Sequence, residues 1–179
     1  MYGKVGPMEE LSLNAREDFE KVLGRYNKMV YRLAYSRTQN CHDADDVLQE
    51  VFLRYVKCGK IFNDEEHRKA WLIRITINCS KSLVTNGWRK HTTDDEITDD
   101  TEGVPDRELE LYDTKTAVYD AVMQLPVKYR TVVHLFYYED LPISAVCEAT
   151  GASETAVKTQ LHRARGILKE KLKGVEFDA

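Results

Sequence analysis

A strongly acidic segment in the second half of the chain limits what the 179 residues can fold into. Residues 91–113 carry ten Asp and Glu against a single Arg, and Gly103 and Pro105 interrupt the segment further. A segment with so much like charge and so little apolar surface cannot bury a core, so it is predicted to be a flexible linker. The chain is therefore predicted to form two small domains, residues 1–90 and 114–179.

The charge on either side of this linker is nearly balanced. Residues 1–90 hold 16 Lys and Arg against 12 Asp and Glu, and residues 114–179 hold 9 against 8, so the net charge of −4 arises in the linker. No apolar run approaches the roughly 18 residues of a membrane helix, and the first ten residues lack the apolar stretch of a signal peptide. We expect no membrane insertion and a cytoplasmic location.

The residue types that bind metals or perform catalysis are scattered. The four cysteines include no Cys-x-x-Cys pair, which argues against a disulfide framework or a zinc site. Cys41 and His42 could donate two metal ligands, and His42 with Asp43 resembles half of a hydrolase site, but nothing nearby completes either. We predict no metal, no cofactor and no enzyme activity.

Helical periodicity dominates the first domain, and no strand-like alternation or hairpin signal is present. A capping box at Asn14 begins the first expected helix, Gly24 is expected to break or kink it, Asp43 is expected to cap the second, and Asn86-Gly87 to end the third. The three expected helices span residues 14–39, 43–57 and 65–83.

The second of these helices has two distinct faces. Val47, Val51 and Tyr55 form a stripe that should face a core. A second line mixes acids, an amide and aliphatic residues, which a purely solvated face would not need; it consists of Asp46, Gln49, Leu53 and Val56, with Glu50 beside it. Periodicity alone leaves open an ordinary amphipathic helix with a ragged boundary.

The third helix and the residues after it combine cations with an amide and an aromatic ring. Cations follow phosphates, while amides and aromatic rings can hold an unstacked base, so the set suits a melted single strand. A basic solvated face, with Trp71 in the core, is the alternative. The set is Arg74, Asn78, Lys81, Trp88, Arg89 and Lys90.

The second domain is predicted to contain a helix-turn-helix. One helix should end before Pro126, another should run over residues 127–138, and the motif should follow from Ile143, with Gly151 at the turn and Ser153 as N-cap. Its last helix is rich in Lys and Arg, which suits a major groove and its phosphates. A plain helical hairpin remains the alternative. The predicted fold is all-α: two small helical domains joined by an acidic flexible linker, the second a helix-turn-helix.

The residue order in three places resembles bacterial RNA polymerase sigma factors of the extracytoplasmic-function (ECF) type. Residues 43–53, Asp-Ala-Asp-Asp-Val-x-Gln-Glu-Val-Phe-Leu, are similar to the family's region 2 helix, which binds the clamp of the polymerase β′ subunit. The resemblance implies that the polymerase contacts are Asp46, Gln49, Glu50, Leu53 and Val56.

The second similarity is to the promoter-melting segment of region 2. Trp71-Leu-x-x-Ile-x-x-Asn78 matches that segment, and residues 60–63 match a loop that, with Asn78, accepts a flipped base of the minus-ten element. Ser82 and Thr85 depart from the residues common there. The minus-ten contacts implied are Phe62, Asn63, Arg74, Asn78, Lys81, Trp88, Arg89 and Lys90.

The third similarity is to region 4, which reads the minus-thirty-five element. It rests on Leu-Pro-x-x-x-Arg-x-Val at residues 125–132 and on Ala-Val-Lys-Thr-x-Leu-His-Arg-Ala-Arg at residues 156–165. Gln160 stands where an Arg is common. The DNA contacts implied are Ser153, Thr155, Lys158, Thr159, His162, Arg163 and Arg165.

The function implied is that of an alternative sigma factor. Its partners would be core RNA polymerase, through the β′ clamp and the β flap, promoter DNA, and an anti-sigma factor. The alternative is a stand-alone helix-turn-helix regulator that binds its operator without the polymerase.

Overall fold

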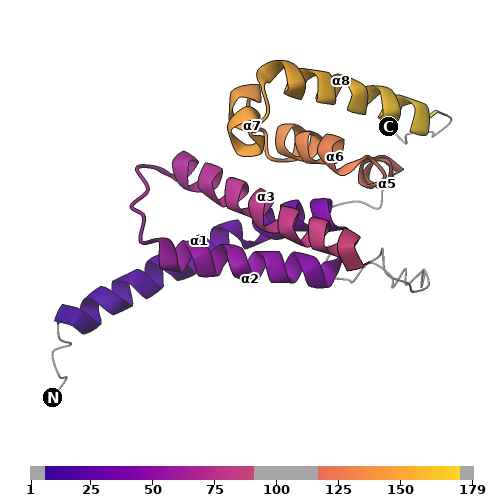
Figure 1. Ribbon diagram of the computed structural model, residues 1–179. Coiled ribbons are helices and arrows are strands. Elements are labelled where there is room, and N and C mark those ends of the chain that lie inside the picture. The colour runs from indigo at the N-terminus through magenta and orange to yellow at the C-terminus, as the bar shows by residue number, and fades with distance from the viewer. Residues whose placement is uncertain (1–6, 91–116, 174–179) are drawn as a thin grey trace.

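The computed structural model describes residues 7–90 and 117–173, with side chains for residues 18–81 and 117–173. Within these ranges every regular element is a helix, which confirms the predicted all-α class (Figure 1). No helix in the described residues is long and apolar enough to cross a membrane. The segment predicted to be a linker lies outside them.

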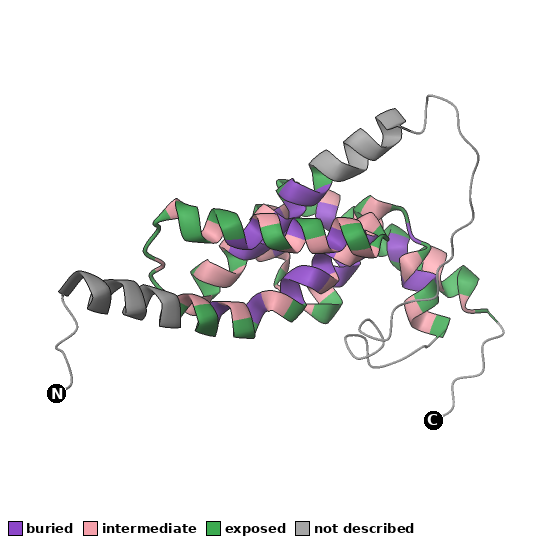
Figure 2. Ribbon diagram, turned by 90° about the horizontal axis from the view of Figure 1, so that it is seen from below, coloured by how far each residue is buried: buried purple, intermediate pink, exposed green. Residues whose placement is uncertain are grey.

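The first group of helices consists of α1 (Pro7–Thr38), α2 (Cys41–Cys58) and α3 (Glu65–Lys90). They pack on one another because each carries an apolar stripe: Val30 and Leu33 of α1, Val47 and Val51 of α2, and Leu72 of α3 are all essentially inaccessible. Figure 2 shows buried stretches where the helices face one another and exposed stretches on their outer sides.

Several helix ends differ from those expected. The first helix begins at Pro7 rather than Asn14 and passes through Gly24 without a break. The third continues through Asn86-Gly87 to Lys90. One interior glycine costs a helix only about 1 kcal/mol relative to alanine, so it does not stop a helix that other interactions support.

The cap of α2 is Asn40, not Asp43 as predicted. The Asn40 side chain accepts a hydrogen bond of 3.0 Å from the main-chain N–H of Asp43, which lies in the first turn. The helix ends as predicted, because Gly59 adopts a left-handed conformation with φ of 56°.

The second group of helices confirms the helix-turn-helix. It contains α5 (Ala117–Met123), α6 (Val127–Val133), a π-helical turn η1 (His134–Tyr138), α7 (Ile143–Thr150) and α8 (Glu154–Lys171). Gly151, with φ of 73°, forms the turn between α7 and α8, and the Ser153 side chain accepts from the N–H of Ala156 at 3.2 Å. The π turn was not predicted: Glu139 N–H bonds to the His134 carbonyl, five residues back, at 3.2 Å.

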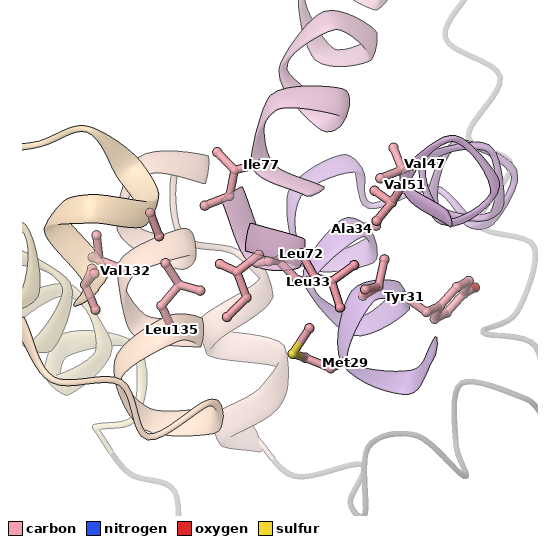
Figure 3. Close-up of a cluster of buried hydrophobic side chains, with 14 of the residues drawn as sticks. Met29, Tyr31, Leu33, Ala34, Val47, Val51, Leu72, Ile77, Val132 and Leu135 are labelled. Atoms are coloured by element: carbon pink, nitrogen blue, oxygen red, sulfur yellow. The ribbon is translucent and has the colours of Figure 1, made fainter. Parts of the chain in front are cut away.

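The two groups pack directly against each other, α6 on α1 and α7 on α3. Their apolar side chains form one continuous core. In Figure 3, Leu33 and Leu72 lie in its middle, with Ala34, Val47 and Val51 on one side and Val132 and Leu135 on the other. Ile77 of α3 is also buried in this core.

Two buried arginines connect the groups across this core. Arg37 of α1 donates to the Ser80 hydroxyl at 2.6 Å and to the Thr131 hydroxyl of α6 at 2.5 Å. Arg130 of α6 donates in the opposite direction, to the main-chain carbonyl of Ser36. Burial, with the nearby Arg130 charge, lowers the pKa of Arg37 to about 10, so its guanidinium remains charged at neutral pH.

Candidate functional site

The outer face of α2 presents the line of residues predicted to bind the polymerase. Asp46, Gln49, Leu53 and Val56 are all exposed, Leu53 by 52% and Val56 by 60%. The opposite face of α2 is buried in the helix bundle, so this line has no packing role there. Two aliphatic side chains exposed beside an acid and an amide indicate a surface for a protein partner.

A hollow of about 420 Å³ lies along this line. Glu50, which is half-buried, lines it, and the Glu50 carboxylate accepts a hydrogen bond from Arg54 Nε at 2.6 Å. This ion pair is about half exposed, so it contributes at most a few tenths of a kcal/mol to stability. The ion pair orients the Glu50 side chain. The hollow is lined by Asp46, Val47, Gln49, Glu50, Leu53, Arg54 and Cys79.

Phe62 belongs to an aromatic cluster between α2 and α3. Its ring stacks on Tyr55 with centroids 5.7 Å apart and meets Trp71 edge-on, also at 5.7 Å. The Arg68 guanidinium lies 5.6 Å from the Phe62 centroid. These contacts tie the loop between α2 and α3 to both helices, and Asn63 is exposed beside them.

The outer face of α3 exposes Arg74, Asn78 and Lys81. The structure brings these three together, but it does not bring Phe62 against Asn78. Phe62 contacts Trp71, and Asn78 is seven residues further along, roughly 10 Å of helix rise. The side chains of Trp88, Arg89 and Lys90 lie outside the described residues.

The helix α8 lies on the outer side of the second group, with α6 between it and α3 (Figure 1). Thr155, Thr159 and His162 are exposed on one side of it, and Lys158 is exposed beside them in an ion pair with Glu154 at 2.5 Å. Ser153 is exposed at the helix start, where its hydroxyl caps α8. All of the residues predicted to read the minus-thirty-five element therefore lie on the surface.

Two tyrosines that no sequence pattern singles out lie beside the arginines of α8. Arg165 Nε donates to the Tyr137 hydroxyl at 2.8 Å. Arg163, together with the nearby Lys128, lowers the pKa of Tyr129. Both contacts join segments far apart in sequence, and neither has a local sequence signal.

A second hollow, of about 350 Å³, lies where the two groups meet. Arg37 and Lys81 line it from the first group, and Lys128 and Gln160 from the second. In the part of the chain that the structure describes, no three His, Cys, Asp or Glu side chains gather closely enough to hold a metal ion.

Family models match both parts of the chain. Residues 22–90 match the model of Sigma-70 region 2, and residues 115–168 match that of Sigma-70, region 4. Two similar proteins from Bacillus subtilis are the ECF RNA polymerase sigma factor SigM, 30% identical over 84% of this chain and 92% of its own length, and SigW, 26% identical over 93% and 95%.

Two solved structures share the fold. The sigma factor RpoE from Bartonella quintana, in complex with the anti-sigma factor NepR, matches with a TM-score of 0.66 and 19% identity over 89% of this chain and 99% of that one. CnrH, in complex with the cytosolic domain of CnrY, matches with a TM-score of 0.62 and 22% identity over 90% and 91%.

Proposed function

Because the chain belongs to the ECF RNA polymerase sigma factors of the sigma-70 family, we propose that three of its surfaces divide the work of promoter recognition. The chain is an alternative sigma factor, which directs RNA polymerase to promoters and starts transcription there. The surfaces proposed are the outer line of α2, the outer face of α3 with its preceding loop, and the exposed side of α8.

The line on α2 binds core RNA polymerase at the β′ clamp. The observation that supports this most directly is the exposure of Leu53 and Val56 on a helix whose other face is fully buried. Burying two aliphatic side chains at a protein interface stabilises it by about 1.5–3 kcal/mol each, and Asp46, Gln49 and Glu50 supply polar groups that set orientation.

The outer face of α3 binds the melted strand of the minus-ten element. Arg74 and Lys81 offer charge to the phosphates, and Asn78 between them offers both a donor and an acceptor to a base edge. Phe62 and Asn63 border this face at the start of α3. Phe62 is already stacked with Tyr55, so its role is to shape the loop as well as to contact a base.

The helix α8 enters the major groove of the minus-thirty-five element. Its N-terminus is capped, and its exposed side offers Thr159, His162 and Lys158 to bases and phosphates. A stand-alone helix-turn-helix regulator would need no such surface on α2, and the region 2 match over residues 22–90 favours the sigma factor.

The remaining partners follow from the family. We infer from the family that the second group also contacts the polymerase β flap. We also infer that an anti-sigma factor binds the chain, since the structural neighbour RpoE is in complex with the anti-sigma factor NepR. We infer that the chain acts by binding rather than by catalysis. Its proposed partners, polymerase and DNA, lie in the cytoplasm, and we infer that the chain acts there.

The α2 assignment is tested by the double variant Gln49→Ala with Leu53→Asp. It should weaken binding to purified core polymerase at least tenfold, because a buried carboxylate replaces an apolar contact, while helicity by circular dichroism stays unchanged. A matched control, Gln124→Ala with Lys28→Asp, alters exposed residues elsewhere and should bind normally. Normal binding by the folded α2 variant would remove the assignment.

A further inference from the structure

The exposed residues of α8 do not all point in one direction. Thr155, Thr159 and His162 are three or four residues apart and form a line opposite the buried Val157 and Leu161. At about 100° per residue, Arg165 lies roughly 90° to one side of this line and Arg163 roughly 70° to the other side. The two arginines therefore flank the line instead of belonging to it.

Arg165 is held on its flank by Tyr137. The Tyr137 hydroxyl accepts from Arg165 Nε at 2.8 Å, and the guanidinium carbon lies 5.9 Å from the centre of the Tyr137 ring. The bond occupies Nε, so the two terminal amino groups of Arg165, which bond to no other described residue, can approach another acceptor. An arginine fixed in advance loses less conformational entropy when it binds.

Arg163 lies on the other flank, near Tyr129. Together with Lys128, whose ammonium lies 4.9 Å from the centre of the Tyr129 ring, it lowers the pKa of Tyr129. The hydrogen bond between a tyrosine and an arginine is on the Arg165 flank. Tyr129 comes from α6 and Tyr137 from η1.

The π turn determines where Tyr137 lies relative to Tyr129. Eight residues of uninterrupted α-helix would place the two tyrosines about 80° apart around the helix. A π turn holds an additional residue, so it rotates the residues that it contains relative to that pattern, and Tyr137 lies within η1. With this rotation, Tyr137 meets Arg165.

We propose that Tyr137 is a positioning residue for promoter DNA. A helix in the major groove has a sugar-phosphate backbone on each side, and phosphate contacts fix its register. Tyr137 holds Arg165 toward one backbone, Arg163 on the other flank faces the second backbone, and Thr159 and His162 face the bases. The inference rests on the proposed function, since it requires α8 to lie in the major groove.

The test is a double-mutant cycle between Tyr137 and Arg165, made in the full chain and measured as holoenzyme with core polymerase on promoter duplex. Tyr137→Phe removes only the accepting oxygen and should weaken binding three- to tenfold, with a log–log salt slope shallower by up to about one ion. In the Arg165→Ala background it should have no further effect. Tyr138→Phe, at the adjacent exposed tyrosine, is the control and should bind as wild type.

Three results would overturn the proposal. The first is a wild-type affinity and salt slope for folded Tyr137→Phe. The second is an effect of Tyr137→Phe that is equally large with and without Arg165, since a tyrosine that acts through the arginine cannot act in its absence. The third is normal binding by Arg165→Ala. Promoter-dependent transcription by the same holoenzymes would show that the proposed function stands even then.

Discussion

Glu139, which follows η1 in the second group, pairs with Lys69 of the first group. Its carboxylate lies 3.3 Å from Lys69 Nζ of α3, and Lys69 also donates to the Glu139 main-chain carbonyl at 3.1 Å. The buried His134 Nε2 is 3.6 Å from the other carboxylate oxygen. Burial alone would raise the pKa of this carboxyl, but His134 and the Lys69 ammonium outweigh it, and the pKa is lowered.

A lowered pKa in the folded chain makes stability depend on pH in a defined direction. The contribution of Glu139 is fully present above the ordinary glutamate pKa of 4.5 and is lost as the pH falls through the lowered folded value. Glu139→Gln should therefore reduce the free energy of unfolding by about 2 kcal/mol at pH 7, and the difference from wild type should shrink below pH 4.5.

Thermal unfolding of the two proteins between pH 3.5 and 7 measures this, with Asp140→Asn, an exposed neighbour, as the control. A difference between wild type and Glu139→Gln that stays constant down to the lowest pH would contradict the assignment, because it would show that ionisation of Glu139 contributes nothing.

The sequence predicted some individual site residues better than others. The line on α2 and the exposed trio on α3 repeat at helical spacing, so their common faces could be read directly from the sequence. Tyr137 could not be found in this way. Its contact to Arg165 crosses between elements and depends on the π turn, which has no pattern in the sequence.

The start of α2 shows how far a capping preference predicts where a helix begins. Both Asn40 and Asp43 are good capping residues, and the dense acids after Asp43 favoured the later one. The structure caps the helix with Asn40 and places Asp43 in the first turn, where its charge still favours the helix dipole. A capping preference alone cannot choose between two candidates three residues apart.

The choice of cap is testable by mutation. Asn40→Ala removes the side-chain acceptor for the Asp43 N–H and should cost about 1 kcal/mol of folding free energy. Asp43→Ala keeps that bond, which uses the main chain, and should cost no more than about half as much. Urea unfolding compares the two. A larger loss for Asp43→Ala would place the cap where the sequence had indicated it.

Across the whole molecule, the sequence predicted the helices and their order but not how the two groups meet. Two adjoining lines of α3 are buried, one with Leu72 and Cys79 and one with Ile73 and Ile77. Helical periodicity could not distinguish one broad buried face from two separate ones. The sequence also did not predict that Arg37 and Arg130 are buried, because a buried arginine is recognised only when its acceptors are known. Those acceptors, Thr131 and the Ser36 carbonyl, lie 94 residues away in sequence.

Transcription in a purified system would show whether this chain selects promoters for core RNA polymerase. Core polymerase with the wild-type chain would be supplied with a library of random upstream sequences, and the transcript starts would be sequenced. We expect starts that require the chain, that share one element near minus ten and one near minus thirty-five, and that vanish with Gln49→Ala and Leu53→Asp. The same starts without the chain, or no starts while the chain alone binds a duplex site, would contradict it.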